Sequence, residues 1–379
     1  MAVESKPGQR TVTPFRYDNV GSFLRPEKLK EARASHAEGN LSATELKKIE
    51  DECIVDLIHK QKEVGLQAVT DGEFRRSWWH LDFMWELHGV QKETVEKGYA
   101  FHGAETRPET ARLTGKISGE NHSFIEDFKF IQQYAMDDVI ARQTIPAPAQ
   151  FLAELQRPEN IKSTESIYPD LEELVTDIAN AYQQVISDLY DAGCRSLQID
   201  DCTWGMLCDP HFFEFRPDNT GVKEVGELFL NVNNLSLQNL PGDLVVTTHV
   251  CRGNYNSTWA SSGGYDPVAE LLFAKANVSA YYLEFDTERA GGFEPLQHVS
   301  DDKLVVLGLF SSKIGELEDK EAIKARIEEA TKFVELDRLC VSPQCGFAST
   351  EEGNILTEEQ QWNKLRLIKE VADEVWGEK

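Results

Sequence analysis

The chain has 379 residues, of which 39 are Lys or Arg and 65 are Asp or Glu, so its formal net charge is −26 at pH 7. This excess of carboxylates argues against binding to nucleic acid or to an anionic membrane surface. Seven scattered cysteines argue against a disulfide scaffold, and no run of about 18 apolar residues predicts a membrane span. The first ten residues lack the apolar core of a signal peptide, so we expect a cytoplasmic protein with reduced thiols.

Short β-branched runs alternate with longer amphipathic segments. The predicted strands are residues 17–22, 66–70, 139–145, 195–199, 243–248, 279–284, 303–309 and 337–342. The predicted helices are residues 43–64, 170–192, 222–239, 265–276, 319–334 and 357–376. Several strands are almost continuously apolar, which is typical of parallel strands covered on both faces. This α/β alternation predicts a single (β/α)8 TIM-type barrel over residues 1–379.

Two segments depart from the alternation. Residues 85–135 place Gly103, Gly115 and Gly119 between short polar and apolar runs. We interpret them as an inserted, hairpin-like segment that lies over one end of the barrel. Residues 1–14 precede the first predicted strand, and we expect them to be flexible.

Functional residues of such a barrel gather where the strands end. Four residues at the predicted strand ends are of metal-binding types, namely His249, Cys251, Glu284 and Cys345. One imidazole, two thiolates and one carboxylate suit tetrahedral Zn²⁺. The simpler alternative is a buried histidine with structural cysteines, both of which are common in cores.

Three further thiols compete for the ligand role: Cys202, Cys208 and Cys340. Cys340 lies inside an apolar run, which favours a core thiol. Two thiolates and a carboxylate make zinc a poor Lewis acid for hydrolysis but leave it well suited to a substrate thiol. Such a thiol loses its proton near neutral pH and stays nucleophilic, so the ligand types indicate alkyl transfer to a thiol.

Five motifs resemble, in the same order, the cobalamin-independent methionine synthase family, in its catalytic C-terminal barrel and its short single-barrel branch. They are Val-Gly-Ser-Phe-Leu-Arg-Pro (20–26), Asp-Gly-Glu-Phe-Arg-Arg (71–76), His-Val-Cys-Arg-Gly-Asn (249–254), Leu-Glu-Phe-Asp (283–286) and Ser-Pro-Gln-Cys-Gly-Phe-Ala-Ser-Thr-Glu-Glu-Gly-Asn (342–354). The resemblance implies zinc held by His249, Cys251, Glu284 and Cys345.

The resemblance also implies a homocysteine pocket. Val20 and Ser22 would hold the carboxylate of the amino acid, and Glu73 and Asp200 would hold its ammonium group. From the residues alone, Ser22 would be a turn or cap residue and Asp200 a helix N-cap.

The chain also departs from the family pattern. Full-length members carry a second, N-terminal barrel that helps to hold a polyglutamylated folate, for which 379 residues leave no room. Those members have Asp-Glu-Pro-Ala where this chain reads Asp-Asp-Cys-Thr at 200–203, and a proton-donating His where it has Lys313. Lys313 could orient an anionic substrate or donate a proton if its pKa were lowered. Its simpler alternative is a solvated surface lysine.

An aromatic stretch follows the second motif. Trp78 and Trp79 are expected near the substrate mouth, where they could stack a flat methyl donor such as a pterin. Packing at the barrel rim is the competing explanation.

Together these residues predict a zinc-dependent S-methyltransferase that forms methionine from homocysteine and 5-methyltetrahydrofolate (polyglutamate), with Lys313 and Asp200 as catalytic residues. One alternative keeps the machinery but changes the partners: a methylcorrinoid protein as donor, or a coenzyme M-like thiol attacking an epoxide, as in the related epoxyalkane transferases. A second is a non-catalytic zinc- or corrinoid-binding accessory barrel, against which Ser22, Glu73 and Asp200 argue.

Overall fold

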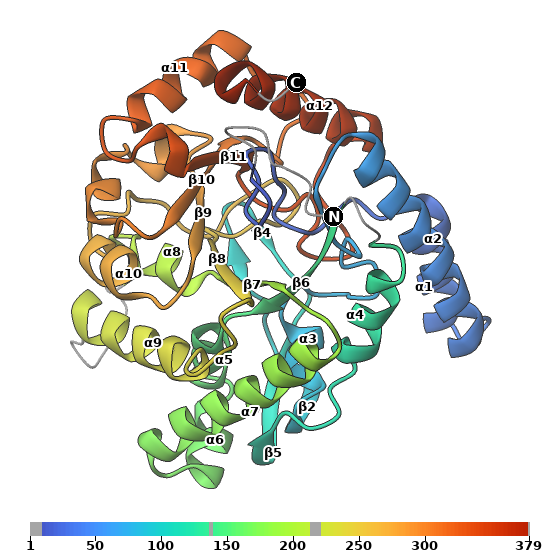
Figure 1. Cartoon of the computed structure of the whole chain (residues 1–379). Coiled ribbons are helices and arrows are strands. Elements are labelled where there is room, and N and C mark those ends of the chain that lie inside the picture. Colours follow the sequence, from blue (N-terminus) through green and yellow to red (C-terminus); the bar gives the residue numbers. More distant parts are fainter. Residues whose placement is uncertain (1–9, 136–138, 213–220, 378–379) are drawn as a thin grey trace.

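A curved parallel sheet forms the centre of the computed structural model, which describes residues 10–135, 139–212 and 221–377. Within these residues the sheet has seven strands in the order β1-β6-β7-β8-β9-β10-β11. Helices cover its outer side (Figure 1). The strands are β1 (Ala68–Val69), β6 (Ile140–Pro146), β7 (Ser196–Asp201), β8 (Val245–Val250), β9 (Ala280–Glu284), β10 (Leu304–Phe310) and β11 (Leu339–Pro343).

The second to the eighth predicted strands are confirmed as these seven strands, but the first, residues 17–22, is not a strand. Tyr17 makes a single parallel bridge with Val341. Next to it, the Asp18 side chain accepts hydrogen bonds from the backbone N–H groups of Phe15 and Asn19, at 3.1 and 2.8 Å. These local bonds compete with a ladder, as short polar side chains do. The observed sheet therefore has seven strands among the described residues where eight were predicted.

The six predicted helices are all present. They are α2 (Ala43–Glu63), α7 (Leu171–Asp191), α9 (Val222–Ser236), α10 (Ala269–Lys275), α11 (Lys320–Ala330) and α12 (Glu358–Trp376). The described residues also form α1 (Glu27–Ala37), α3 (Leu81–Trp85), α4 (Phe124–Gln132), α5 (Pro148–Leu155), α6 (Ile161–Ile167) and α8 (Thr203–Leu207), with 3₁₀ turns η1 (Glu288–Ala290), η2 (Glu294–His298) and η3 (Leu336–Arg338).

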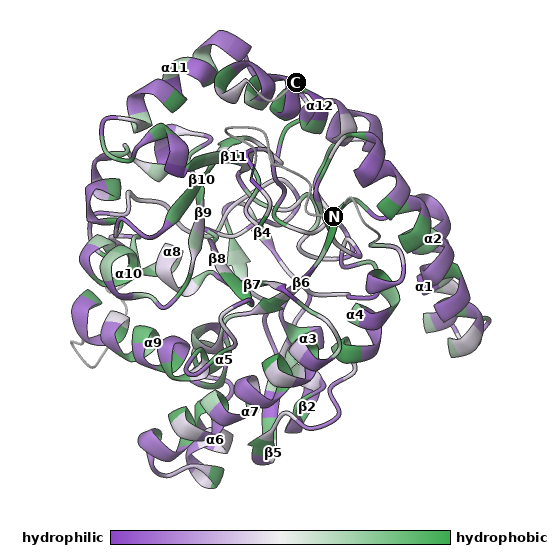
Figure 2. Ribbon diagram, in the orientation of Figure 1, coloured by the Kyte–Doolittle hydropathy of each residue, from purple (hydrophilic) through white to green (hydrophobic). Residues whose placement is uncertain are grey.

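The long helices begin and end where their sequences indicate. The Asp170 side chain caps α7 by accepting a hydrogen bond from the Glu172 N–H at 3.0 Å, and the helix ends before Gly193, whose φ is 102°. One face of α7 is buried, and the hydrophilic faces of α2 and α11 point outward (Figure 2). None of the helices in the described part of the chain is both long and apolar enough to cross a membrane.

Residues 85–135 contain two antiparallel strand pairs besides α4. β2 (His88–Thr94) pairs with β5 (Glu109–Ser118), and β3 (Ala100–Phe101) pairs with β4 (Ala104–Glu105). At the N-terminus, residues 1–9 lie outside the described residues. Thr13 and Pro14 are buried, so these two residues of the segment predicted to be flexible are packed against the fold.

Candidate metal centre and substrate cavity

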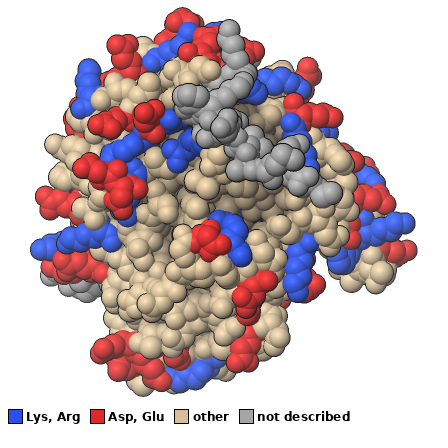
Figure 3. Space-filling model, viewed as in Figure 1, with Lys and Arg blue, Asp and Glu red and all other residues tan. Residues whose placement is uncertain are grey.

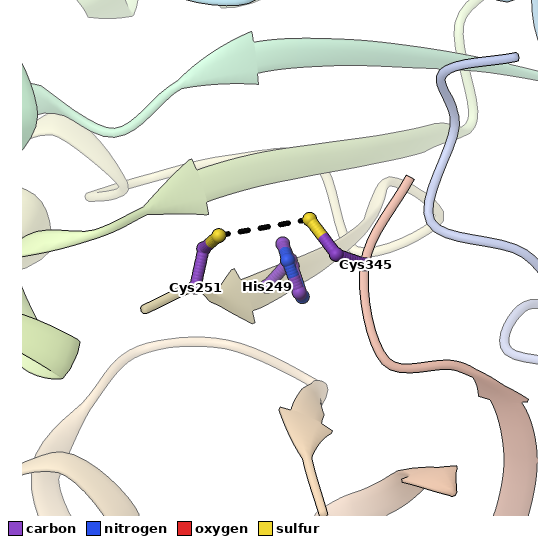
Figure 4. A group of neighbouring side chains, drawn as sticks. All are labelled: His249, Cys251 and Cys345. Carbon is purple, nitrogen blue, oxygen red and sulfur yellow. Dashed lines mark hydrogen bonds between the residues drawn. The ribbon is translucent and has the colours of Figure 1, made fainter. Parts of the chain in front are cut away.

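Three of the four predicted metal ligands meet at the carboxyl ends of the strands. His249 lies on β8, Cys251 follows that strand directly, and Cys345 follows β11. Their ligand atoms all lie within 4.8 Å of one another, and the two sulfur atoms are 3.6 Å apart. Figure 4 shows the two sulfurs facing each other with the imidazole between their side chains. All three side chains are buried.

The hydrogen bonding of the His249 imidazole leaves one ring nitrogen available for a metal ion. Its Nδ1 lies 3.2 Å from the carbonyl oxygen of Tyr282, which can only accept, so Nδ1 carries the proton. Its Nε2 is buried and has no hydrogen-bond partner among the described residues. A histidine with one nitrogen bonded to a carbonyl and the other free is the usual arrangement of a metal ligand. The three residues therefore fit a zinc ion.

The thiol of Cys251 interacts with two neighbouring thiols. Hydrogen bonds from Cys202 and from Cys345 hold the pKa of Cys251 well below its usual range. The thiolate is the form that binds zinc. The rival Cys202 thus lies against Cys251 but outside the group of three, and Cys340 is buried in a small core cluster with Val20, Tyr282 and Val306.

Glu284, the fourth predicted ligand, ends β9 but is not part of the group. Its Oε1 accepts a hydrogen bond from the Arg252 N–H at 2.8 Å, and its Oε2 lies 3.0 Å from the guanidinium of Arg289. Both carboxylate oxygens therefore have protein partners.

A cavity of about 340 Å³ opens beside the metal group. The predicted substrate residues all line it together with His249, Cys251 and Cys345; they are Val20, Ser22, Glu73, Trp78, Trp79 and Asp200. Strand ends and loops far apart in the sequence thus contribute to one site, as is typical of this class of fold.

Two buried carboxyl groups face this cavity. Burial raises the pKa of Asp200 to about 8, opposed by the nearby His249 and reinforced by Glu73. Glu73 bonds Arg76 at 3.2 Å and the Thr144 hydroxyl at 2.9 Å through Oε1, while its buried Oε2 has no partner among the described residues. An unpaired carboxylate oxygen beside a second carboxyl group is suited to a ligand ammonium group.

Lys313 is placed differently from these residues. Its side chain is buried, so the alternative of a solvated surface lysine is wrong. It does not line the cavity, and its Nζ has no hydrogen-bond partner within the described part of the chain.

Four aromatic residues that were not predicted for the site also line the cavity, two of them from the segment 85–135. Tyr99, Phe101, Tyr255 and His80 add aromatic surface to that of Trp78 and Trp79. The Trp78 side chain is fixed by a hydrogen bond, because its Nε1 donates to the Glu109 carboxylate at 2.6 Å. Two of them had a usable signal, since His80 follows Trp79 directly in the aromatic stretch and Tyr255 follows the 249–254 motif directly.

With this geometry in view, comparison with known proteins defines the class. Residues 15–374 match the catalytic domain of the cobalamin-independent synthases, and the chain belongs to this family. Family and structural neighbours support a methionine synthase-like methyltransferase.

Particular relatives cover nearly the whole chain. The uncharacterized protein YxjG of Bacillus subtilis is 45% identical over 98% of both chains. The crystal structure of a candidate vitamin-B12-independent methionine synthase from Listeria monocytogenes has a TM-score of 0.76 and 41% identity, and covers 97% of this chain and 100% of that one. A methionine synthase of Saccharolobus solfataricus is 23% identical over 86% of each chain.

Proposed function

We propose that this chain is a zinc-dependent S-methyltransferase that forms methionine by methyl transfer from 5-methyltetrahydrofolate (polyglutamate) to homocysteine. The observation that carries the proposal is one shared cavity, in which His249, Cys251 and Cys345 lie beside Ser22, Glu73 and Asp200. A thiol-binding centre and an amino-acid pocket are the two parts that such a reaction needs.

Each group has a defined task in this proposal. His249, Cys251 and Cys345 would hold zinc, with Glu284 as the nearby carboxylate, and bound zinc would lower the pKa of a substrate thiol. Holding the thiol close to the methyl group supplies much of the rate enhancement.

The amino acid would be bound at its two charged ends. The backbone of Val20 and the hydroxyl of Ser22 take the carboxylate of homocysteine. Glu73 and Asp200 take its ammonium group, whose positive charge favours the ionised form of Asp200. Asp200 is the catalytic carboxyl group at the substrate.

The donor would lie against the aromatic wall. Trp79, Tyr99 and Phe101 line the cavity with few competing polar groups, which suits a flat pterin ring.

Assays of methionine formation test this proposal. The zinc-loaded protein is given homocysteine with 5-methyltetrahydrofolate as monoglutamate or triglutamate, or with a methylcorrinoid protein, and a parallel assay offers coenzyme M with an epoxide. We expect methionine from the folate donors, and a strongly raised KM for homocysteine in Glu73→Gln. Methionine from the corrinoid donor alone would show that folate is not the methyl donor. The absence of product with every donor would overturn the proposed methionine-forming reaction.

Binding of homocysteine to the cobalt-substituted protein separates an enzyme from an accessory barrel. We expect new metal–sulfur absorption when homocysteine is added. An unchanged spectrum would favour the non-catalytic alternative.

A further inference from the structure

Lys313 is a buried cation that the proposed reaction does not yet use. Its side chain is 6% exposed, and its Nζ makes no hydrogen bond to any described residue. A buried ammonium group without partners is costly, so nearby negative charge has to compensate it.

The sheet places the segment that carries Lys313 between the two strands that lead to Glu284 and Cys345. β10 lies between β9, which ends at Glu284, and β11, which leads into Cys345. Directly before Lys313, the Ser312 N–H donates to the Gln344 side chain at 2.5 Å, and the Ser312 hydroxyl donates to the Gly346 carbonyl at 2.9 Å. The strand end that carries Lys313 is therefore joined to both neighbours of Cys345.

The charges near Lys313 agree with this position. Burial raises the pKa of Glu284, and Lys313 is the strongest opposing influence, ahead of Arg289 and Arg252. The hydrogen bond with Cys251 and burial raise the pKa of the Cys345 thiol, and Lys313 opposes that rise. Lys313 is not among the residues that line the cavity.

The net charge of the metal centre indicates a role for the Lys313 ammonium group. Two thiolates would balance the charge of Zn²⁺, and Glu284 pairs with Arg289 at 3.0 Å, so a substrate thiolate would add a net negative charge to the site. In a buried site such an excess is unfavourable, and a nearby ammonium group offsets part of it.

We propose that Lys313 is a positioning residue whose ammonium group supplies the counter-charge that lets the buried metal centre accept an anionic thiolate. The inference rests on the proposed function for the metal centre, but not on the identity of thiol or methyl donor. His249, Cys251 and Cys345 would hold the metal, and a bound thiol would lose its S–H proton to solvent without oxidation or reduction.

Ligand binding to the cobalt-substituted protein tests the proposal. The probes are 2-mercaptoethanol, which binds as an anionic thiolate, and imidazole, which binds as a neutral ligand; both are followed by visible absorption. In Lys313→Met we expect about tenfold weaker thiolate binding and unchanged imidazole binding, because only the anion depends on the counter-charge. Lys313→Arg should restore thiolate affinity.

Lys303 is a matched control at the other end of the same strand. It is also a buried lysine, but its Nζ donates to the carbonyls of Ala276 and Val278, at 2.7 and 2.8 Å. Lys303→Met should keep wild-type affinity for both probes.

Other outcomes overturn the proposal. Unchanged thiolate affinity in Lys313→Met, or equal weakening of thiolate and imidazole binding, would show that Lys313 supplies no charge-specific support. Failure of the wild type to bind cobalt would overturn both the metal-dependent function and the role of Lys313. Failure of the methionine assay in a protein whose variants behave as expected would overturn the proposed reaction alone.

Discussion

At the scale of single residues, the metal group rests on side chains that only folding brings together. Cys251 and Cys345 are 94 residues apart in the chain, yet their sulfurs are 3.6 Å apart. We expect about one zinc per chain, and its loss from Cys345→Ser and His249→Ala, because each change removes one of the three converging ligands. Metal analysis of the purified variants measures this.

The control for these variants is Cys340→Ser, which removes a buried thiol from β11 without touching the metal group. It should keep its zinc. Full zinc in Cys345→Ser together with loss from Cys340→Ser would show that the ligand assignment is wrong.

His122 carries a second prediction at this scale, on acid stability. Its Nε2 donates to the Phe83 carbonyl at 3.0 Å, its Nδ1 accepts from the Phe124 N–H at 3.3 Å, and burial lowers its pKa to about 4. The folded state therefore favours the neutral ring, and its stabilising contribution is complete above the unfolded pKa of about 6.5. It is lost as the pH falls toward 4, by up to about 3 kcal/mol.

Denaturant unfolding at pH 7 and pH 4 checks this contribution. His122→Gln keeps a donor but cannot be protonated, so its free energy of unfolding should fall less than that of the wild type. His59→Gln, on an exposed position of α2, should follow the wild type. Parallel pH profiles for wild type and His122→Gln would contradict the assignment.

At the scale of elements, the loop after β8 depends on a glycine. Gly253 has φ of 90°, its N–H lies 3.3 Å from the Cys251 sulfur, and an added Cβ would lie 2.7 Å from the Ala260 backbone nitrogen. We expect Gly253→Ala to lower the free energy of unfolding and the zinc content together, because the loop that carries Cys251 must shift.

Gly103 is the matched control for this variant. It also has a positive φ, 76°, but an added Cβ would have no neighbour within 4 Å. Gly103→Ala should cost about 1 kcal/mol from backbone strain alone and leave the zinc content unchanged. Equal effects of the two substitutions would show that crowding at Gly253 is unimportant.

The elements also show how far sequence patterns reach. Seven strands and six helices were predictable because continuous apolar runs and amphipathic periods are local signals. The helix α1 was missed because it buries only Leu29 and Ala32 and so has little amphipathic pattern. The first predicted strand failed because Asp18 bonds its own backbone neighbours.

At the scale of the whole molecule, the net charge of −26 coexists with a finely mixed surface. On the face shown in Figure 3, Lys and Arg side chains alternate with Asp and Glu around the edge, and no continuous basic stripe crosses that face. The basic groups near the site lie inside instead: Arg252 and Lys313 are buried, and the partly buried Arg289 lies 3.0 Å from Glu284.

The sequence by itself determined the class of protein, the order of the main strands and the residue types available for a metal, because motifs and hydrophobic periods are properties of the local chain. Only the tertiary structure decided how those residues are used. It united His249, Cys251 and Cys345, tied both oxygens of Glu284 to protein donors, and buried Lys313. The physical reason is that distance, burial and competing hydrogen bonds arise from packing between strands that are remote in the chain.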